Sequence, residues 1–177
     1  MAQHSTLAGF LLVVTGIFIA CNIYSLIPLY HVIGDEFSIP AQQVASGSFS
    51  FTFCYAVGLL FFGTVAERIG LKRVIVSGLG FAVATSFLVS LSTNSLTLII
   101  FRGLQGFTLA SFAPVSFNYC FHIFSQQRRR TFWIACINVG FLCAGIIGQL
   151  ISSKLMSQAW QFVYISYSII YLFLGIT

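Results

Sequence analysis

The stretch GTVAERIGLKR, from Gly63 to Arg73, places four charged side chains and two glycines in eleven residues of an otherwise apolar chain. Of the 177 residues, 58% are hydrophobic and only 6% are charged. A water-soluble domain carries about 25% charged residues, so most of this surface must face lipid rather than water. The charged stretch therefore marks a place where the chain leaves a membrane.

Outside this stretch, apolar residues gather in six long runs. They lie at 7–33, 45–66, 74–92, 96–122, 131–154 and 161–177. A helix crosses a bilayer core about 30 Å thick with about 20 mostly apolar residues. Strands of a membrane β-barrel alternate apolar and polar residues over about 10 positions, a pattern that these longer runs lack. The sequence predicts an all-α integral membrane protein, one domain over 1–177 with six transmembrane helices.

Basic residues predict the orientation, because short loops rich in Lys and Arg stay in the cytoplasm. The second and fourth connections hold six of the eight basic residues: Arg68, Lys72, Arg73, Arg128, Arg129 and Arg130. The first connection has Asp35 and Glu36, which we expect in a solvated turn, and the last has only Lys154. We expect both termini in the cytoplasm. Pro28 and Pro114 are expected to bend the first and fourth helices.

Arg102 lies within the fourth run, about seven residues from its outer start and so roughly 10 Å deep. A guanidinium at that depth costs a few kcal/mol or more unless it faces protein or water, which makes it a candidate functional residue. Snorkelling to the outer interface is the alternative. Gln105 lies on nearly the same helical face, and Gly106 would let another backbone approach closely. This polar stripe predicts a water-filled cavity beside the helix.

With these motifs, the chain resembles the amino-terminal half of a major facilitator superfamily transporter, of the bacterial drug/proton antiporter type. The resemblance covers nearly all of the chain. GTVAERIGLKR matches the loop 2–3 signature of that family at Gly63, Arg68, Gly70 and Lys72. Glu67 stands where Asp is usual, and Arg73 follows one place late. The resemblance implies that this loop gates the transporter by latching against its other half. Glu67 would pair with Arg68 or Lys72, or accept from helix-end donors. Gly63 would permit close contact with a neighbouring helix, and Gly70 a left-handed turn.

Two further motifs lie in the fourth and fifth helices. Arg102, Gln105 and Gly106 match a helix-four signature, which implies that Arg102 lines the central cavity and takes part in proton coupling, held by Gln105. In helix five, Gly140 and Gly148 fit an antiporter signature loosely, whereas Ala144, Gly145 and Gln149 replace its Gly, Pro and Gly. This favours efflux, and glycines packing two helices explain it about equally well. Asn22 is the residue of helix one that we expect at the cavity.

The resemblance implies secondary active transport of a small molecule by alternating access, coupled to protons and leaning to efflux, rather than an enzyme. No cofactor is expected, because a proton gradient would supply the energy. The five cysteines lie in apolar runs without a CxxC pair, so no metal site is expected. The expected partners are the lipid bilayer of a plasma or inner membrane, a small-molecule substrate, and a missing C-terminal half or a second chain. Nucleic acid is not expected.

Several functions remain open at this point. The apolar end at LFLGIT favours a fragment of a longer transporter. An inactive truncated remnant and a six-helix channel-like homodimer are alternatives, although we find no NPA pair or TVGYG-like filter. An intramembrane hydrolase would need a Ser with a His or Asp partner inside the membrane, and none is evident in the sequence.

Overall fold

A computed structural model describes residues 2–176, with side chains from Thr6 onward. The expected domain ends at residues 1 and 177 lie outside the described residues. The helices are α1 (Ala2–Tyr24), the 3-10 helix η1 (Ile27–Leu29), α2 (Tyr30–Phe37), α3 (Ala41–Ile69), α4 (Leu71–Ser90), α5 (Ser95–Leu109), α6 (Ala113–Ile123), α7 (Gln127–Leu155) and α8 (Gln161–Ile176). Within residues 2–176, five spans are long and apolar enough to cross a membrane, and α8 is a shorter apolar helix. The all-α membrane fold predicted from the sequence is confirmed.

The first and fourth membrane spans are each interrupted by a short turn where the sequence predicted a bend, and the backbone there keeps right-handed helical angles. The first consists of α1, η1 and α2, and the fourth of α5 and α6. Pro28 lies in η1, and Pro114 lies in the first turn of α6. A proline has no N–H to donate to the carbonyl four residues earlier. Those carbonyls belong to Tyr24, the last residue of α1, and Ala110, which caps α5.

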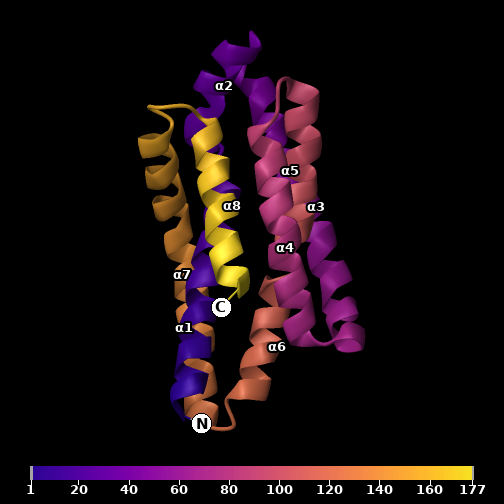
Figure 1. The fold of residues 1–177 in the computed structure, drawn as a ribbon, viewed down its shortest axis with the longest axis vertical. Coiled ribbons are helices and arrows are strands. Elements are labelled where there is room, and N and C mark those ends of the chain that lie inside the picture. Colours follow the sequence, from indigo (N-terminus) through magenta and orange to yellow (C-terminus); the bar gives the residue numbers. More distant parts are fainter. Residues whose placement is uncertain (1, 177) are drawn as a thin grey trace.

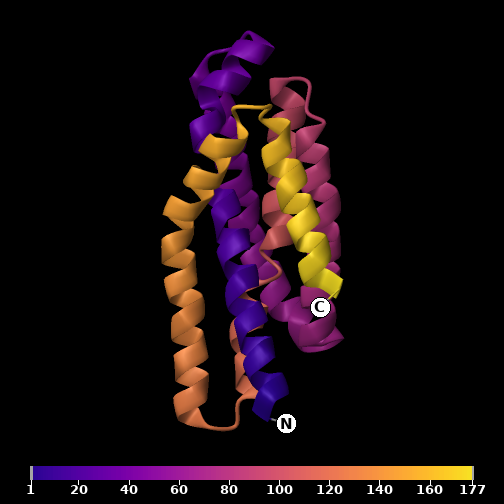
Figure 2. The same cartoon turned by 60° about the vertical axis from the view of Figure 1, so that its left-hand side comes forward.

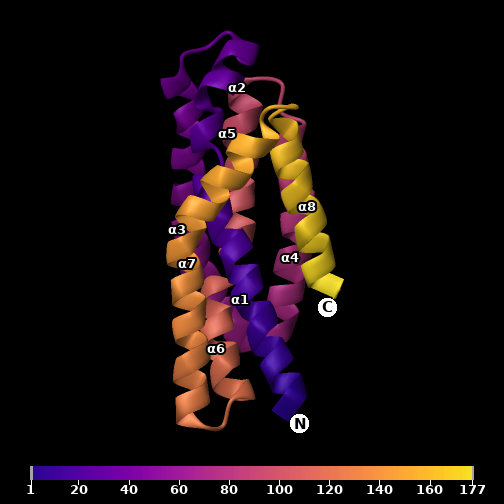
Figure 3. The same cartoon turned by 90° about the vertical axis from the view of Figure 1, so that its left-hand side faces the viewer.

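Three helix pairs make the most extensive contacts: α1 with α7, α3 with α5, and α4 with α8. Figures 1, 2 and 3 show the members of each pair lying side by side along the bundle. The pairs are related by exchanging spans one, two and three with spans four, five and six, in that order. Under this exchange the pair α1–α7 becomes the pair α5–α3. The pair α4–α8 becomes itself. This is the packing expected of two inverted three-helix units. The two broken spans exchange with each other under the same operation.

The charged stretch of residues 63–73 consists of two helix ends and one glycine instead of an extended loop. Only Gly70 separates α3 from α4, and its φ of +100° is a conformation that L side chains rarely adopt. The apolar runs of the sequence had placed the end of one helix at 66 and the start of the next at 74, which left the charged residues 67–73 outside both helices. The helices continue through them because Glu, Arg and Lys are good helix formers once the backbone has left the lipid. The link at Gly70 and the link between α6 and α7 lie at the same end of the bundle (Figure 1).

Asp35 and Glu36 are exposed, as expected, but they lie in the last turn of α2 rather than in a loop. The first span continues as α2 to Phe37. Trp160 Nε1 donates to Glu36 Oε2 at 2.7 Å, and Gln161 Nε2 donates to Glu36 Oε1 at 3.1 Å. The carboxylate therefore lies at the N-terminus of α8, where the helix dipole favours a negative charge. Glu36 joins the neighbouring ends of the first and sixth spans.

Candidate functional site

Arg102 is enclosed within the bundle and is 0% exposed. Its Nη1 donates to Gln105 Oε1 at 2.7 Å, and its Nη2 donates to the Asn22 carbonyl at 3.0 Å. The ring centroid of Phe51 lies 4.3 Å from the guanidinium carbon, a cation–π geometry. The arginine does not snorkel, because Nη1 and Nη2 both have acceptors inside the protein. It also does not line an open cavity, as the family resemblance implied, because Phe51 and Asn22 cover it.

The Asn22 carbonyl is available to Arg102 because α1 ends at Tyr24. The last four carbonyls of a helix have no partner within the helix, and they carry the negative end of its dipole. The Asn22 carbonyl accepts from Ser25 Oγ at 3.0 Å as well as from Arg102. The helix break thus provides a partial negative charge for a buried cation. This accommodates an intramembrane arginine although all three acidic residues lie near helix ends.

Hydrogen bonds extend from this arginine to two other helices. Gln105 Nε2 donates to Ser86 Oγ at 2.8 Å, which ties α5 to α4. Asn22 Nδ2 donates to the Tyr171 hydroxyl, which donates to the Phe18 carbonyl at 3.0 Å. Asn22 is 0% exposed and faces α8, so it does not line an open cavity as the sequence had suggested. A buried amide needs polar partners, and Tyr171 is the one that α8 supplies.

Three tyrosines of α8 complete the cluster, and sequence reasoning missed them. Tyr164, Tyr167 and Tyr171 are buried. Their spacing of three and four residues in YISYSIIY places them on one helical face, a signal that could have revealed them. Four buried polar atoms of the cluster have no partner among the described residues: Asn22 Oδ1, Arg102 Nε, Tyr164 Oη and Tyr167 Oη. Under-satisfied buried networks of this kind are typical of functional sites.

The glycines named from the sequence lie mainly at helix contacts. A Cβ added at Gly106 would overlap the Phe51 carbonyl of α3, and one at Gly148 would lie 2.6 Å from the Cys21 carbonyl of α1. A Cβ at Gly140 would lie 2.8 Å from Ile17, whereas one at Gly145 would lie 3.6 Å from the Tyr24 ring. Helix packing within this chain therefore accounts for Gly106, Gly140 and Gly148.

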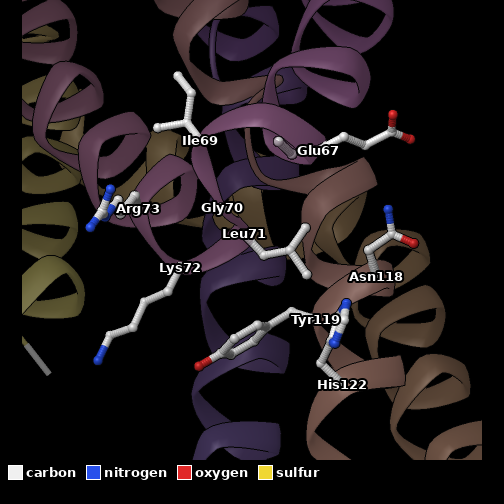
Figure 4. Close-up of a pocket in the computed structure, with 10 residues that line it drawn as sticks. Glu67, Ile69, Gly70, Leu71, Lys72, Arg73, Asn118, Tyr119 and His122 are labelled. Atoms are coloured by element: carbon white, nitrogen blue, oxygen red, sulfur yellow. The ribbon is translucent and has the colours of Figure 1, made fainter.

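The charged stretch borders a separate cavity of about 590 Å³. Its lining residues are Ala66, Glu67, Ile69, Gly70, Leu71, Lys72, Arg73, Asn118, Tyr119 and His122. Figure 4 shows Glu67 pointing to the opposite side of the link from Lys72 and Arg73, so the expected Glu67–Lys72 pair is not formed here. Nothing lies within 4 Å of a Cβ added at Gly63, so the close helix contact expected there is not made within the described chain. Arg68 is exposed beside this surface.

The model of the Major Facilitator Superfamily matches residues 12–177. The chain belongs to the major facilitator superfamily. Since the family consists of membrane transporters and the spans are apolar, the chain is a multi-pass membrane protein of a transporter family rather than of an enzyme family.

Relatives of this major facilitator chain come from a fungus and from bacteria. "Cercosporin MFS transporter CTB4" of Cercospora nicotianae is 33% identical over 138 residues, 75% of this chain and 26% of that protein. "Inner membrane transport protein YnfM" of Escherichia coli is 35% identical over 98 residues, 55% of this chain and 23% of that protein. "Probable multidrug resistance protein EmrY" of the same bacterium is 29% identical over 117 residues, 64% of this chain and 23% of that protein. The matched region of the chain covers about a quarter of the length of each of these relatives.

Proposed function

We propose that this chain is the amino-terminal half of a secondary active transporter that moves a small molecule by alternating access. The observation that carries the proposal is the pair of helix breaks at residues 25–29 and 110–112, in spans that exchange under the inverted repeat. Discontinuous helices in corresponding repeats typically form the binding and coupling sites of secondary transporters. Arg102 belongs to the fourth span and binds the carbonyl freed at the break in the first.

We further propose that transport is driven by protons and directed outward, with Arg102 as the coupling residue and Gln105 positioning it. The names of two relatives, a probable multidrug resistance protein and a cercosporin transporter, support small-molecule efflux. The under-satisfied Arg102 cluster supports coupling, because its groups have spare donors and acceptors with which to exchange partners. A proton gradient would then supply the energy without a cofactor.

The proposed partners are the lipid bilayer, a small-molecule substrate and a second six-helix unit. The relatives are about four times longer than the matched region, which supports a second half on the same chain. The coding DNA beyond the codon for Thr177 tests this. We expect it to encode six further apolar spans. A stop codon there, with a chain that dimerises in detergent, would favour the homodimer instead, and a stop codon with a monomeric, inactive chain would favour the remnant.

The transport proposal is tested with the product of the complete reading frame in proteoliposomes. We expect an imposed pH gradient to drive accumulation of radiolabelled chloramphenicol, and an uncoupler to abolish it. A channel-like protein would let this probe follow its own concentration gradient whether or not a pH gradient is present. Flux that ignores the pH gradient would therefore contradict proton-coupled transport.

The gating role of the charged stretch predicts that Glu67→Gln shifts the balance between inward-open and outward-open forms. If Glu67 latches the cytoplasmic side, its loss removes about 1 kcal/mol from the closed form, a change of about fivefold in the ratio. A cysteine placed at Asn118, which lines the adjoining cavity, should then react about fivefold faster with a membrane-impermeant maleimide. Arg128→Gln, which removes another charge at the same end, is the control and should change nothing. Equal reaction rates in all three proteins would refute the latch.

The same labelling tests the proposed orientation, in a background whose five native cysteines are replaced. A cysteine at Ser125, in the link before α7, should react only from the cytoplasmic side. One at Thr93, in the link before α5, should react only from the outside. The reverse pattern would overturn the proposal that both termini are cytoplasmic.

A further inference from the structure

A cavity of about 370 Å³ opens between α1, α3 and α7, and its wall includes Tyr24, Tyr55, Asn138 and Phe141. Tyr24 follows Asn22 by two residues, about 200° around a helix with 3.6 residues per turn. Asn22 therefore faces the Arg102 cluster and α8, while Tyr24 faces α7 and this cavity. The cavity is separate from the buried arginine cluster.

The cavity lies at the middle of the membrane spans. Tyr55 is the central residue of α3 (Ala41–Ile69), and Phe141 is the central residue of α7 (Gln127–Leu155). Tyr24 is the last residue before the break in the first span. Small-molecule sites are concave, mostly apolar and aromatic, with a few polar groups that fix orientation. This wall has that composition at the depth where the helix breaks lie.

Asn138 is the polar group that singles out this face. Its side chain is exposed at mid-span, and its Nδ2 donates to the Ile134 carbonyl at 3.0 Å. An amide oxygen that faced lipid at this depth would have no hydrogen-bond donor, which is costly. The amide therefore faces water, protein or a bound molecule. Its Oδ1 and its second N–H are left for that partner.

Charge also limits what the cavity accepts. The lining residues carry no charged side chain. The Tyr55 ring is stacked on Phe51 with 5.9 Å between centroids, and Phe51 also lies against the Arg102 guanidinium. The Phe51 ring thus lies between the positive charge of Arg102 and the Tyr55 ring in the cavity wall. This charge disfavours the binding of a cation in the cavity. An anion would exchange its hydration shell for only a few neutral hydrogen-bond donors, because the enclosed Arg102 side chain cannot reach it. An anion is therefore disfavoured as well.

We propose that the substrate of this chain is an uncharged, flat aromatic molecule with one hydrogen-bonding group, and that Tyr24, Tyr55 and Asn138 determine its selectivity. The two tyrosine rings stack on the aromatic face, and the Asn138 amide bonds the polar group. This inference rests on the proposed transport function, and it separates the substrate-contacting residues from the coupling residue Arg102. It also gives Gly145 a role, because this glycine leaves room for the Tyr24 ring.

The binding experiment uses the 177-residue chain in lipid nanodiscs, with empty nanodiscs to correct for partition into lipid. Three probes are compared: N-phenyl-1-naphthylamine, which is uncharged; 1-anilinonaphthalene-8-sulfonate, which carries the same rings and one negative charge; and ethidium, a flat cation. We expect saturable binding of the uncharged probe and binding of the other two weaker by about tenfold or more, because charge enters an apolar site unpaired.

Matched variants locate the site. Tyr55→Leu and Asn138→Leu should each lower affinity for the uncharged probe about three- to tenfold, through the lost stacking and the lost hydrogen bond. Gln149→Leu is the control, because Gln149 is another exposed amide of α7, bonded to its own helix at Gly145, and it does not line the cavity. Gly145→Ala should bind normally because its Cβ makes ordinary contact with Tyr24, whereas Gly145→Leu should bind weakly. Tyr55→Phe keeps the ring, so it should lose less affinity than Tyr55→Leu.

Some outcomes would overturn the proposal. Preferential binding of ethidium or the sulfonate, lowered by the same variants, would refute the uncharged class. An equal loss in Gln149→Leu would refute the site. If the chain binds the uncharged probe but the complete protein shows no pH-driven flux, the proposed transport function is contradicted. If Asn138→Leu and Tyr55→Leu leave the flux unchanged, only this inference is contradicted.

Discussion

Replacing Gly106 by alanine lowers the free energy of unfolding by about 1 to 3 kcal/mol or more, although it adds only one methyl group. The added Cβ would overlap the carbonyl group of Phe51 on α3. A backbone carbonyl cannot rotate aside as a side chain can, so α3 and α5 must move apart. These helices hold Phe51 and Arg102, so the cation–π contact loosens together with the helix pair. The measurement is an unfolding titration in mixed micelles followed by circular dichroism.

The matched control for this result is Gly80→Ala in α4, where nothing lies within 4 Å of the added Cβ. The substitution is the same and also falls inside a helix. Alanine is the better helix former by roughly 0.5–1 kcal/mol, so this variant should be unchanged or slightly more stable. If both variants unfolded at the same denaturant concentration, α3 and α5 would not be in close backbone contact.

Substitution of Arg102 should have the largest effect on transport. Arg102→Ala leaves Gln105 Oε1 without a donor, at about 1–3 kcal/mol for this buried group, and leaves the Asn22 carbonyl with Ser25 Oγ as its remaining donor. Arg102→Lys keeps the positive charge but not the planar fork that reaches both acceptors. We expect both variants of the complete protein to lose pH-driven chloramphenicol flux by more than about tenfold.

The two substitutions at Arg102 separate folding from coupling. Arg102→Lys should unfold closer to the wild type than Arg102→Ala, because it retains a donor for one acceptor. Arg128→Ala removes an exposed arginine and should leave both flux and unfolding unchanged. Wild-type flux in Arg102→Ala would exclude a coupling role, whatever happens to its stability.

The fold could be predicted from the sequence because solubility in lipid depends on local composition. Six apolar runs sufficed for an all-α membrane protein. The hydrogen bond from Arg102 to Gln105 was also within reach, since a spacing of three residues places both on one helical face. Interactions between residues of one helix can be predicted, because they follow from the spacing of three or four residues in the sequence.

Interactions set by the packing of distant helices could not be predicted in this way. Asn22 and Tyr171 are 149 residues apart, and nothing in either segment specifies the other. The contact of Glu36 with Trp160 likewise depends on how the first and sixth spans meet. Hydropathy also misplaced the helix ends near Glu67, because it reports the preference of side chains for lipid and not the hydrogen bonding of the backbone.

The arrangement at the end of α1 makes two residues far apart in the sequence dependent on one another over evolutionary time. Pro28 keeps α1 from continuing, and Arg102 occupies a carbonyl near the end that results. An ancestor that lost the proline would have had a buried charge without this carbonyl, and one that lost the arginine would have kept only Ser25 as a donor to it. We therefore expect the two positions to covary among relatives. An alignment in which each changes without regard to the other would show that the dependence is absent.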